Sequence, residues 1–205
     1  MKIVIIGAGI SGCTAYLLLR KYLPKPPAPA LDHEYIIYEA HNTSNGVSTF
    51  KDLSNNSSYA ATIVIGGGLG LGANGLSVLK RLDENLLKDI TRGGYAYSRF
   101  NMKSKHGRLL MNRLATGSNP PMNSLGLHRH HLWKCLNERV PPGIIVNKRV
   151  SHVEVHTEGR NTVHFVDGSS PVDADLVIGA DGLKSVVKKV MFLEAKGDEY
   201  APRYE

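Results

Sequence analysis

Short apolar runs rich in β-branched residues recur along the chain and predict buried β-strands. Lys2–Ile6 reads KIVII, Glu34–Glu39 reads EYIIYE and Asp175–Gly179 reads DLVIG. Runs of this length and composition are typical of strands that are covered on both faces of a parallel sheet. Residues 60–72, another apolar run that passes into glycines, predict a further strand.

Helical segments separate these runs, marked by good helix formers, leucines at helical spacing and stop signals such as Pro24. Four helices are predicted. The first covers Cys13–Leu23, the second is capped by Asn74 and extends to Leu86, the third covers His128–Val140, and the last begins at Leu183. The predicted β-structure between them is a hairpin of Tyr95–Phe100 with Leu109–Asn112, and a small β-unit of residues 143–147, 150–157 and 162–167. Strands alternating with helices, with inserted β-structure, indicate an α/β fold.

Three glycines follow the first predicted strand directly. Gly7, Gly9 and Gly12 form the pattern GxGxxG between a strand and a helix, which is the context of a dinucleotide-binding turn. Gly7 permits the tight turn, Gly9 lets the backbone approach a pyrophosphate, and Gly12 lets the helix lie close to the strand. Glu39 ends the next strand, where a carboxylate can accept hydrogen bonds from ribose hydroxyls.

The motif alone leaves alternatives open. A glycine-rich turn beside a surface glutamate is the purely structural one, and both NAD and FAD fit a dinucleotide site. Nicotinamide-dependent domains typically alternate strands and helices throughout, whereas here a hairpin and a β-unit interrupt the alternation. The interruption favours a flavoprotein.

Four segments together resemble the FAD-dependent aromatic hydroxylases, the single-component flavoprotein monooxygenases of the salicylate and para-hydroxybenzoate hydroxylase type. They are GAGISG with Glu39, Gly66–Gly75 leading into Arg81-Leu82-Asp83, Arg129-His130-His131-Leu132 with Leu136, and Asp175–Lys188. The resemblance extends from Met1 to about residue 190, and the segments occur in the order of the family.

The resemblance implies a role for each matching residue. The three glycines of the first motif would hold the dinucleotide, and Glu39 would bind the adenosine ribose of FAD. The Gly67-Gly68 backbone would lie near the ribityl chain, and Arg129 would hydrogen-bond to the FAD. The Asp181-Gly182 pair would lie where the family's DG motif meets both the FAD pyrophosphate and NAD(P)H.

The implied fold is an FAD-binding, Rossmann-like domain of the glutathione-reductase type with inserted β-structure. It would comprise residues 1–91 and 127–192, with a small β-unit near 143–167, while residues 92–126 would begin a substrate lobe and 193–205 would form a tail. The family's later Gly-Asp motif has no counterpart between a strand and a helix, since the only candidate is Gly197-Asp198. We therefore expect an amino-terminal portion, truncated before the substrate lobe is complete.

The implied activity is that of an NAD(P)H- and O2-dependent monooxygenase. It would hydroxylate or epoxidise a small aromatic or related organic substrate through a flavin C4a-hydroperoxide, with FAD as cofactor and NADH or NADPH as reductant. Such chemistry needs no protein nucleophile, and the sequence nominates no catalytic acid or base. Two alternatives stay open: a non-catalytic FAD- or dinucleotide-binding remnant, and an NAD-linked dehydrogenase.

The chain of 205 residues has a formal charge of +7, and its basic residues are unevenly placed. Between Arg92 and Arg149 there are eleven Lys and Arg residues and one acidic residue, Glu138. An anionic cofactor or substrate accounts for this excess, and so does an ordinary solvated surface. Nucleic acid is disfavoured because neither zinc-finger spacing nor an aromatic RNA-binding strand is present.

Cysteine and histidine content leads to three further expectations. With two cysteines and no apolar run near the roughly 20 residues of a membrane helix, a reducing, cytoplasmic location without a membrane segment is predicted. Cys13 is interpreted as a small residue that packs against the sheet. No metal site is expected, because neighbours within His128–His131 point to different faces of a helix, and His152 and His156 are interpreted as surface residues of a strand.

Overall fold

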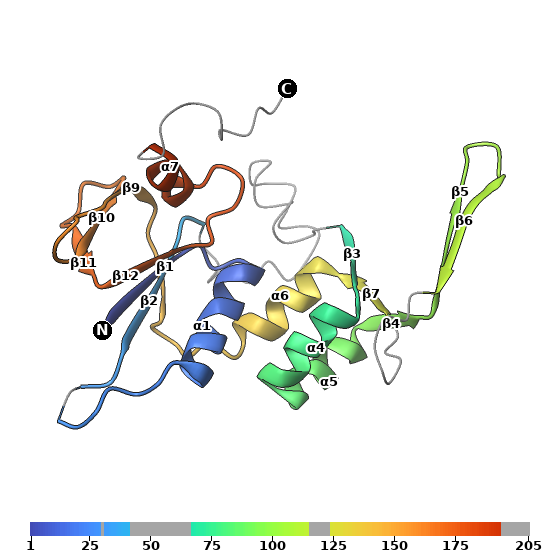
Figure 1. The fold of residues 1–205 in the computed structure, drawn as a ribbon, viewed down its shortest axis with the longest axis horizontal. Helices are drawn as coiled ribbons and strands as arrows, with labels where there is room; N and C mark the ends of the chain where they lie inside the picture. Colours follow the sequence, from blue (N-terminus) through green and yellow to red (C-terminus); the bar gives the residue numbers. More distant parts are fainter. Residues whose placement is uncertain (30, 42–66, 115–123, 194–205) are drawn as a thin grey trace, which may run out of the picture. The chain divides into compact units, whose positions relative to one another are not determined.

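The computed structural model describes residues 1–29, 31–41, 67–114 and 124–193. The chain forms two compact units, one of Met1–Gly46 with Arg139–Glu205 and one of Val47–Glu138. Figure 1 shows the helices and strands of both units, coloured along the chain. The first unit is therefore built from two segments that are far apart in the sequence.

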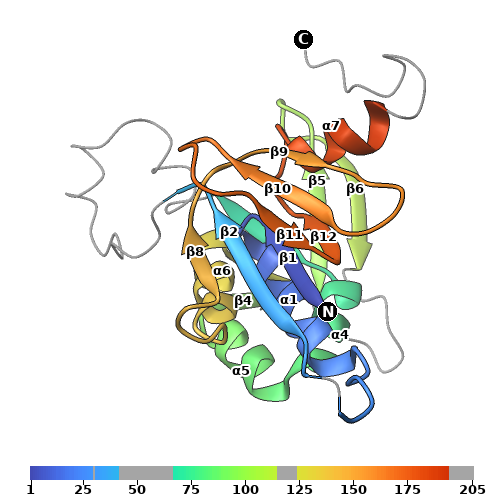
Figure 2. The ribbon, with the colours of Figure 1, turned by 90° about the vertical axis from the view of Figure 1, so that its left-hand side faces the viewer.

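A four-stranded parallel sheet forms the centre of the first unit. Its strands are β1 (Lys2–Ile6), β2 (Glu34–Glu39), β8 (Ile145–Asn147) and β12 (Leu176–Gly179). They lie side by side in the order β12-β1-β2-β8 (Figure 2). Ile3 pairs with Leu176 on one side and with Tyr35 on the other. Three of the strands predicted from apolar runs are thus confirmed as neighbours in one parallel sheet.

Different elements cover the two faces of this sheet. Helix α1 (Ile10–Tyr22) packs on β1, and the ring of Tyr16 meets that of Tyr35 edge-on with centroids 5.5 Å apart. On the other face, Val4 and Ile6 belong to a core shared with an antiparallel sheet and a helix. These elements are β9 (Val150–Glu154), β10 (Asn161–Phe165), β11 (Val172–Ala174) and α7 (Val186–Leu193), with the strand order β11-β10-β9.

Three expectations for the first unit were wrong in detail. Helix α1 begins at Ile10 rather than Cys13. Residues 143–147 do not belong to the small β-unit, because β8 hydrogen-bonds to β2 at the edge of the parallel sheet and β11 completes the small sheet instead. Helix α7 begins at Val186 rather than Leu183, because the hydroxyl of Ser185 caps it by accepting a hydrogen bond from the backbone N–H of Lys188 at 2.9 Å.

Within the described residues, the second unit combines a small antiparallel sheet of order β3-β7-β4 with three helices. Its elements are β3 (Gly68–Leu71), α4 (Ala73–Leu82), α5 (Glu84–Arg92), β4 (Gly94–Tyr97), β5 (Arg99–Lys103), β6 (Leu109–Leu114), β7 (Ser124–His128) and α6 (Arg129–Asn137). Helix α5 contacts α4, α6 and β4, while β5 and β6 pair with each other as a hairpin. The buried leucines of the helices supply the core of this unit.

One long predicted helix of the second unit is two helices in the structure. The backbone leaves the helical conformation at Asp83, whose Oδ1 accepts a hydrogen bond from the backbone N–H of Asn85 at 2.8 Å and so caps α5. The N-cap of α4 is Gly72 rather than Asn74. The predicted hairpin is confirmed in its turn and second strand, but its first strand is β5 rather than Tyr95–Phe100, since Tyr95 and Tyr97 belong to β4, which pairs with β7. Residues 60–66 of the further predicted strand lie outside the described residues.

Across the described ranges, no helix is long and apolar enough to cross a membrane. The division into a nucleotide-binding domain of residues 1–91 and 127–192 and a substrate lobe from 92 to 126 stays a prediction. The two compact units are defined by how the chain packs, whereas the predicted domains are defined by the functions expected of them.

Candidate functional site

The carboxyl ends of three neighbouring strands meet at one edge of the parallel sheet. The backbone N–H of Gly7, just after β1, donates to the carbonyl of Tyr38 in β2 at 2.8 Å, and that of Ala180, just after β12, donates to Ile6 at 2.8 Å. From β1 the chain continues through α1 to β2 on one side, and β12 occupies the other side. Such a switch point, outside the carboxyl ends of parallel strands, is where open α/β sheets bind ligands.

Two glycines of the GxGxxG motif are required by the packing of the chain itself. Gly7 has a φ of +102°, and a Cβ there would overlap the carbonyl oxygen of Ala180. A Cβ at Gly12 would overlap the carbonyl oxygen of Gly7, because the first turn of α1 lies directly against the end of β1. The predicted roles of tight turn and close helix packing are met at both positions.

Gly9 differs from the other two glycines. Its φ of −72° and ψ of −173° are open to any residue, and no atom lies within 4 Å of the position where a Cβ would be. Nothing in the described chain therefore requires a glycine here. A backbone left bare at the start of a helix, facing open space, is what the close approach of a pyrophosphate needs.

The N-terminus of α1 offers backbone donors at the same place. Gly9 is the N-cap, no side chain caps the helix, and no acidic residue lies in its first turn. The first N–H groups of a helix have no partner within the helix, and the helix dipole places partial positive charge there. This end of α1 is suited to a phosphate group.

Glu39 lies beside the glycine turn. Its Oε2 accepts a hydrogen bond from the backbone N–H of Ala8 at 2.7 Å, and its Oε1 accepts one from His41 at 2.9 Å. The carboxylate is thus oriented by the turn that follows β1 and by the end of its own strand. Each oxygen retains acceptor capacity for a further donor, such as a ribose hydroxyl.

The Asp181-Gly182 pair follows β12 at the same edge. Asp181 Oδ2 accepts a hydrogen bond from the backbone N–H of Val186, the first residue of α7, at 2.6 Å. Its Oδ1 is buried, and within the described residues it has no hydrogen-bond partner. Gly182 has a φ of +73°, and apart from its chain neighbours no atom of the described residues lies within 4 Å of the place that a Cβ would take. A buried acceptor beside a bare backbone is a place for a ligand donor.

Cys13 is part of the support of the site and not a reactive group in it. Its side chain is fully buried, and its thiol donates to the carbonyl of Ala8 at 3.4 Å. Burial, with a contribution from the charge of Glu39, raises the pKa of the Cys13 thiol to about 12. The interpretation of Cys13 as a residue that packs against the sheet is confirmed.

We expect Cys13 to resist alkylation in the folded protein. In a Cys135→Ala variant, iodoacetamide at pH 8 should modify the remaining thiol only after the chain is unfolded in urea, because the reactive thiolate is nearly absent at a pKa of about 12. Mass spectrometry of native and unfolded samples measures this. Rapid modification of the native protein would contradict the burial of the thiol.

The remaining predicted residues lie together in the second unit. The backbone N–H of Arg129, at the start of α6, donates to the carbonyl of Gly67 at 3.3 Å. Gly68 begins β3 opposite His128, the last residue of β7. The side chain of Arg129 is exposed. The structure thus brings Gly67, Gly68 and Arg129 to one end of the β3-β7 pair, and their contacts with a cofactor stay a prediction.

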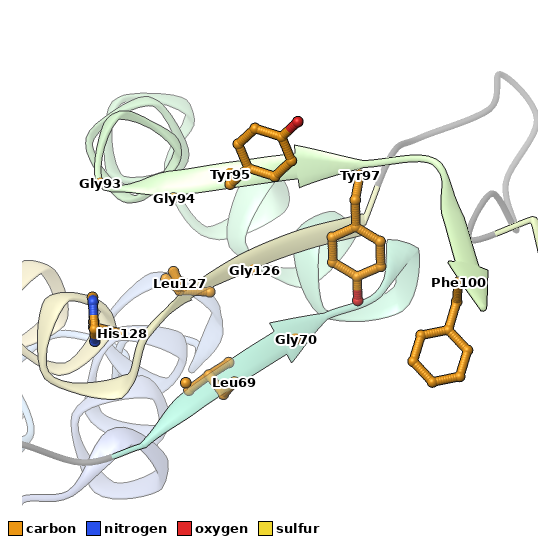
Figure 3. A pocket seen from close by; sticks show the side chains of 11 residues that line it. Leu69, Gly70, Gly93, Gly94, Tyr95, Tyr97, Phe100, Gly126, Leu127 and His128 are labelled. Carbon is orange, nitrogen blue, oxygen red and sulfur yellow. The ribbon is translucent and has the colours of Figure 1, made fainter. Parts of the chain in front are cut away.

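A cavity that the sequence did not predict lies on the sheet of the second unit. It is a shallow depression, open to solvent, with a volume of about 620 Å³, and it is formed by β3, β4, β7 and the start of β5 (Figure 3). Its side chains are those of Leu69, Tyr95, Tyr97, Phe100, Leu127 and His128. Figure 3 shows the Tyr97 ring reaching toward Gly70, where a Cβ would come within 2.8 Å of the phenol oxygen. Several glycines also line the cavity, and because glycine has no side chain they leave room for the aromatic rings.

The parallel sheet and the glycine turn at its strand ends define the chain as an α/β protein with a Rossmann-like fold. No family model matches the sequence. Over 79 residues the chain is 37% identical to a 3-amino-4-hydroxybenzoate 2-monooxygenase from Streptomyces cremeus, a stretch that covers 38% of this chain and 18% of that enzyme. Over 69 residues it is 39% identical to the salicylate hydroxylase asL1 from Sarocladium schorii, covering 33% of this chain and 14% of that enzyme.

The solved structures extend the likeness to nearly the whole chain. HpxO of Klebsiella pneumoniae, in complex with FAD and uric acid, matches with a TM-score of 0.63 and 21% identity over 93% of this chain. The match covers 41% of the HpxO chain, so this chain spans about two fifths of its length. The chain has the fold of FAD-binding monooxygenases over this part, and the resemblance predicted from its four motifs is confirmed.

Proposed function

We propose that the first unit binds FAD, and that the chain provides the flavin-binding part of a monooxygenase that uses O2 and NAD(P)H. The observation that carries this proposal is the meeting of the bare Gly9 backbone, the Glu39 carboxylate and the N-terminus of α1 at one edge of the sheet. The fold shared with FAD-binding monooxygenases makes FAD, rather than NAD, the dinucleotide that we assign.

The residues at the strand ends fit the chemical groups of FAD. The N–H groups at the start of α1 face the pyrophosphate, and Gly9 lets its oxygens come close to the backbone. Glu39, held by the N–H groups of Ala8 and His41, accepts hydrogen bonds from the adenosine ribose. Asp181 offers its unpartnered Oδ1 to a donor on the cofactor.

When bound, the flavin supplies hydride acceptance and oxygen activation. The contribution of this chain is to bind and orient the cofactor. In the second unit, Arg129 and the Gly67-Gly68 backbone are the groups that we assign to further flavin contacts. We assign no general acid or base, although His128, Tyr95 and Tyr97 line the cavity.

We propose a small aromatic or related planar molecule as the substrate. The cavity on β3, β4 and β7 presents the aromatic rings of Tyr95, Tyr97 and Phe100, and such rings favour stacking with planar molecules. The names of the two relatives, a hydroxybenzoate monooxygenase and a salicylate hydroxylase, support an aromatic substrate. The reduced thiols of Cys13 and Cys135 suit the cytoplasmic location that we also propose.

Replacing Glu39 by alanine tests the FAD site directly. We expect the affinity for FAD, measured by quenching of flavin fluorescence, to fall at least about tenfold because charge-assisted hydrogen bonds to the ribose are lost. Glu34→Ala is the matched control, since Glu34 stands at the opposite end of the same strand and forms an exposed ion pair with Lys2 at 3.6 Å. Equal affinities of the two variants would remove Glu39 from the site.

Binding and oxidation assays on the unchanged protein distinguish a monooxygenase from a non-catalytic flavin-binding module and from a dehydrogenase. NAD(P)H oxidation that salicylate or a related hydroxybenzoate stimulates supports a monooxygenase. FAD binding without such oxidation supports a non-catalytic flavin-binding module. Nicotinamide binding without any flavin binding would identify a dehydrogenase and overturn the proposal.

A further inference from the structure

A cluster of histidine and carboxylate side chains lies on the outer face of the small antiparallel sheet. His152 and Glu154 are two residues apart on β9, and His164 pairs with His152 across the sheet on β10. Val153 and Val163 point the other way, into the core. The two histidines and the glutamate therefore share one face, which is separate from the candidate flavin site at the strand ends.

A β-bulge determines which side chains of β9 lie on this face. His164 pairs with His152 while the next residue, Phe165, pairs with Val150, so that Ser151 is the extra residue of β9. Without the bulge, Val150 and His152 would lie on the same face of the strand. With it, Val150 and Phe165 enter the core and His152 remains outside beside Glu154.

The ring nitrogens and the carboxylate approach each other closely. One ligand atom from each of His152, Glu154 and His164 lies within 4.8 Å of the others. His164 Nε2 lies 3.3 Å from Glu154 Oε2. That nitrogen is buried and, in the part of the chain that the structure describes, has no partner with hydrogen-bond geometry. A buried polar atom normally has a hydrogen-bond partner, so this unsatisfied nitrogen beside a carboxylate calls for an explanation.

The neighbouring residues orient the cluster. His152 Nδ1 lies 3.1 Å from the hydroxyl of Ser151, so Nε2 is the ring nitrogen that this contact does not engage. A hydrogen bond to the second ring nitrogen is the usual way in which a metal-binding histidine is oriented. His156, further along the chain, contacts the Thr162 hydroxyl through Nε2 at 3.2 Å, and the same nitrogen lies 4.0 Å from Glu154 Oε2.

We propose that His152, Glu154 and His164 form a binding site for a divalent transition-metal ion of the zinc class. Two imidazoles and one carboxylate are a ligand set that Zn²⁺ accepts, with a water molecule in the fourth position. Bonds of about 2.0–2.2 Å place tetrahedral ligand atoms about 3.3 Å apart. Exposed His152 and Glu154 reach this spacing by side-chain rotation, which opens the stacked arrangement of the two imidazole rings, now 4.3 Å apart.

The bound ion would connect β9 to β10 directly. Because all three ligands come together only in the folded sheet, binding stabilises the folded chain relative to the unfolded one. The site adds a metal-dependent link between strands that otherwise pair through backbone hydrogen bonds. It takes no part in the proposed flavin chemistry.

Titration of the full chain, without a histidine tag, with ZnCl2 tests the proposal by isothermal calorimetry and by the melting temperature. We expect one ion per chain and a higher melting temperature, with the affinity at least about tenfold lower in His164→Asn and in His152→Asn. His106→Asn, in the turn of the β5-β6 hairpin and outside the cluster, should retain the affinity within about threefold. Co²⁺ should give the absorption bands of a tetrahedral site in the unchanged protein.

Two results would overturn the site. One is the absence of stoichiometric Zn²⁺ binding to a correctly folded chain. The other is an unchanged affinity in His164→Asn whose circular dichroism and apo melting temperature equal those of the unchanged protein. FAD affinity, measured with and without ZnCl2, should stay the same, so the outcome does not depend on the flavin assignment.

Discussion

Replacing Gly12 by alanine is expected to lower the free energy of unfolding by about 3 kcal/mol or more. The added Cβ would overlap the carbonyl oxygen of Gly7, which is a backbone atom at the end of β1 and cannot rotate away as a side chain can. Overpacking of a well-packed interior costs about 1–3 kcal/mol, and a clash with fixed backbone lies at or beyond the upper end of that range. Urea unfolding followed by circular dichroism measures the change.

The matched control is Gly75→Ala in α4. Both glycines lie inside helices, where alanine normally stabilises by about 1 kcal/mol. A Cβ at Gly75 would meet Leu71 Cδ2 at 3.6 Å, an ordinary contact distance. Gly75→Ala should therefore be neutral or stabilising while Gly12→Ala destabilises. Equal effects of the two substitutions would show that α1 does not lie as close to β1 as the structure has it.

The parts of the fold that the sequence predicted well are those with a strong local signal. The run at β1 is apolar on both faces because α1 covers one side of this strand and the core around Val4 and Ile6 covers the other. The apolar run at β12 has the same composition, although this strand is only partly covered. The GxGxxG motif was informative because its strand-turn-helix context restricts it, and Gly7 and Gly12 have packing reasons for being glycine.

The parts that were missed depend on partners distant in the sequence. β8 has three residues, and its place in the parallel sheet follows from pairing with β2, which no local pattern of Ile145–Asn147 indicates. The break between α4 and α5 needed Asp83 to be recognised as an N-cap within a run of well-spaced leucines. The predicted helix was continuous because periodicity alone spans such a break.

The aromatic cavity and the histidine cluster were missed for a related reason. The cavity forms where glycines of three strands, each ordinary by itself, become neighbours in the sheet β3-β7-β4. His152 and His156 were correctly interpreted as exposed, but the ligand group pairs His152 with His164 of the next strand through a bulge at Ser151. Strand register and β-bulges depend on how strands pair, and the alternation of apolar and polar residues within one strand does not predict them.

Replacing Gly9 by valine is expected to lower the affinity for FAD at least about 100-fold while the chain stays folded. No atom lies within 4 Å of the Cβ position, so the side chain meets nothing in the described chain and instead occupies the space that we assign to the pyrophosphate. The free energy of unfolding of the apoprotein should change by less than about 1 kcal/mol, since φ and ψ at Gly9 suit any residue and only its modest N-cap preference is lost.

Gly9→Ser separates loss of binding from loss of stability, because the two effects have opposite signs. Serine is a better N-cap than glycine, so the apoprotein should be as stable as the unchanged one or more stable. Its Cβ and hydroxyl still intrude on the approach of the phosphates, and FAD affinity should fall, though by less than with valine. Flavin-fluorescence titration and urea unfolding of the same samples measure both quantities. If Gly9→Val binds FAD as tightly as the unchanged chain, the pyrophosphate does not lie at this turn, and the open space beside Gly9 needs another occupant.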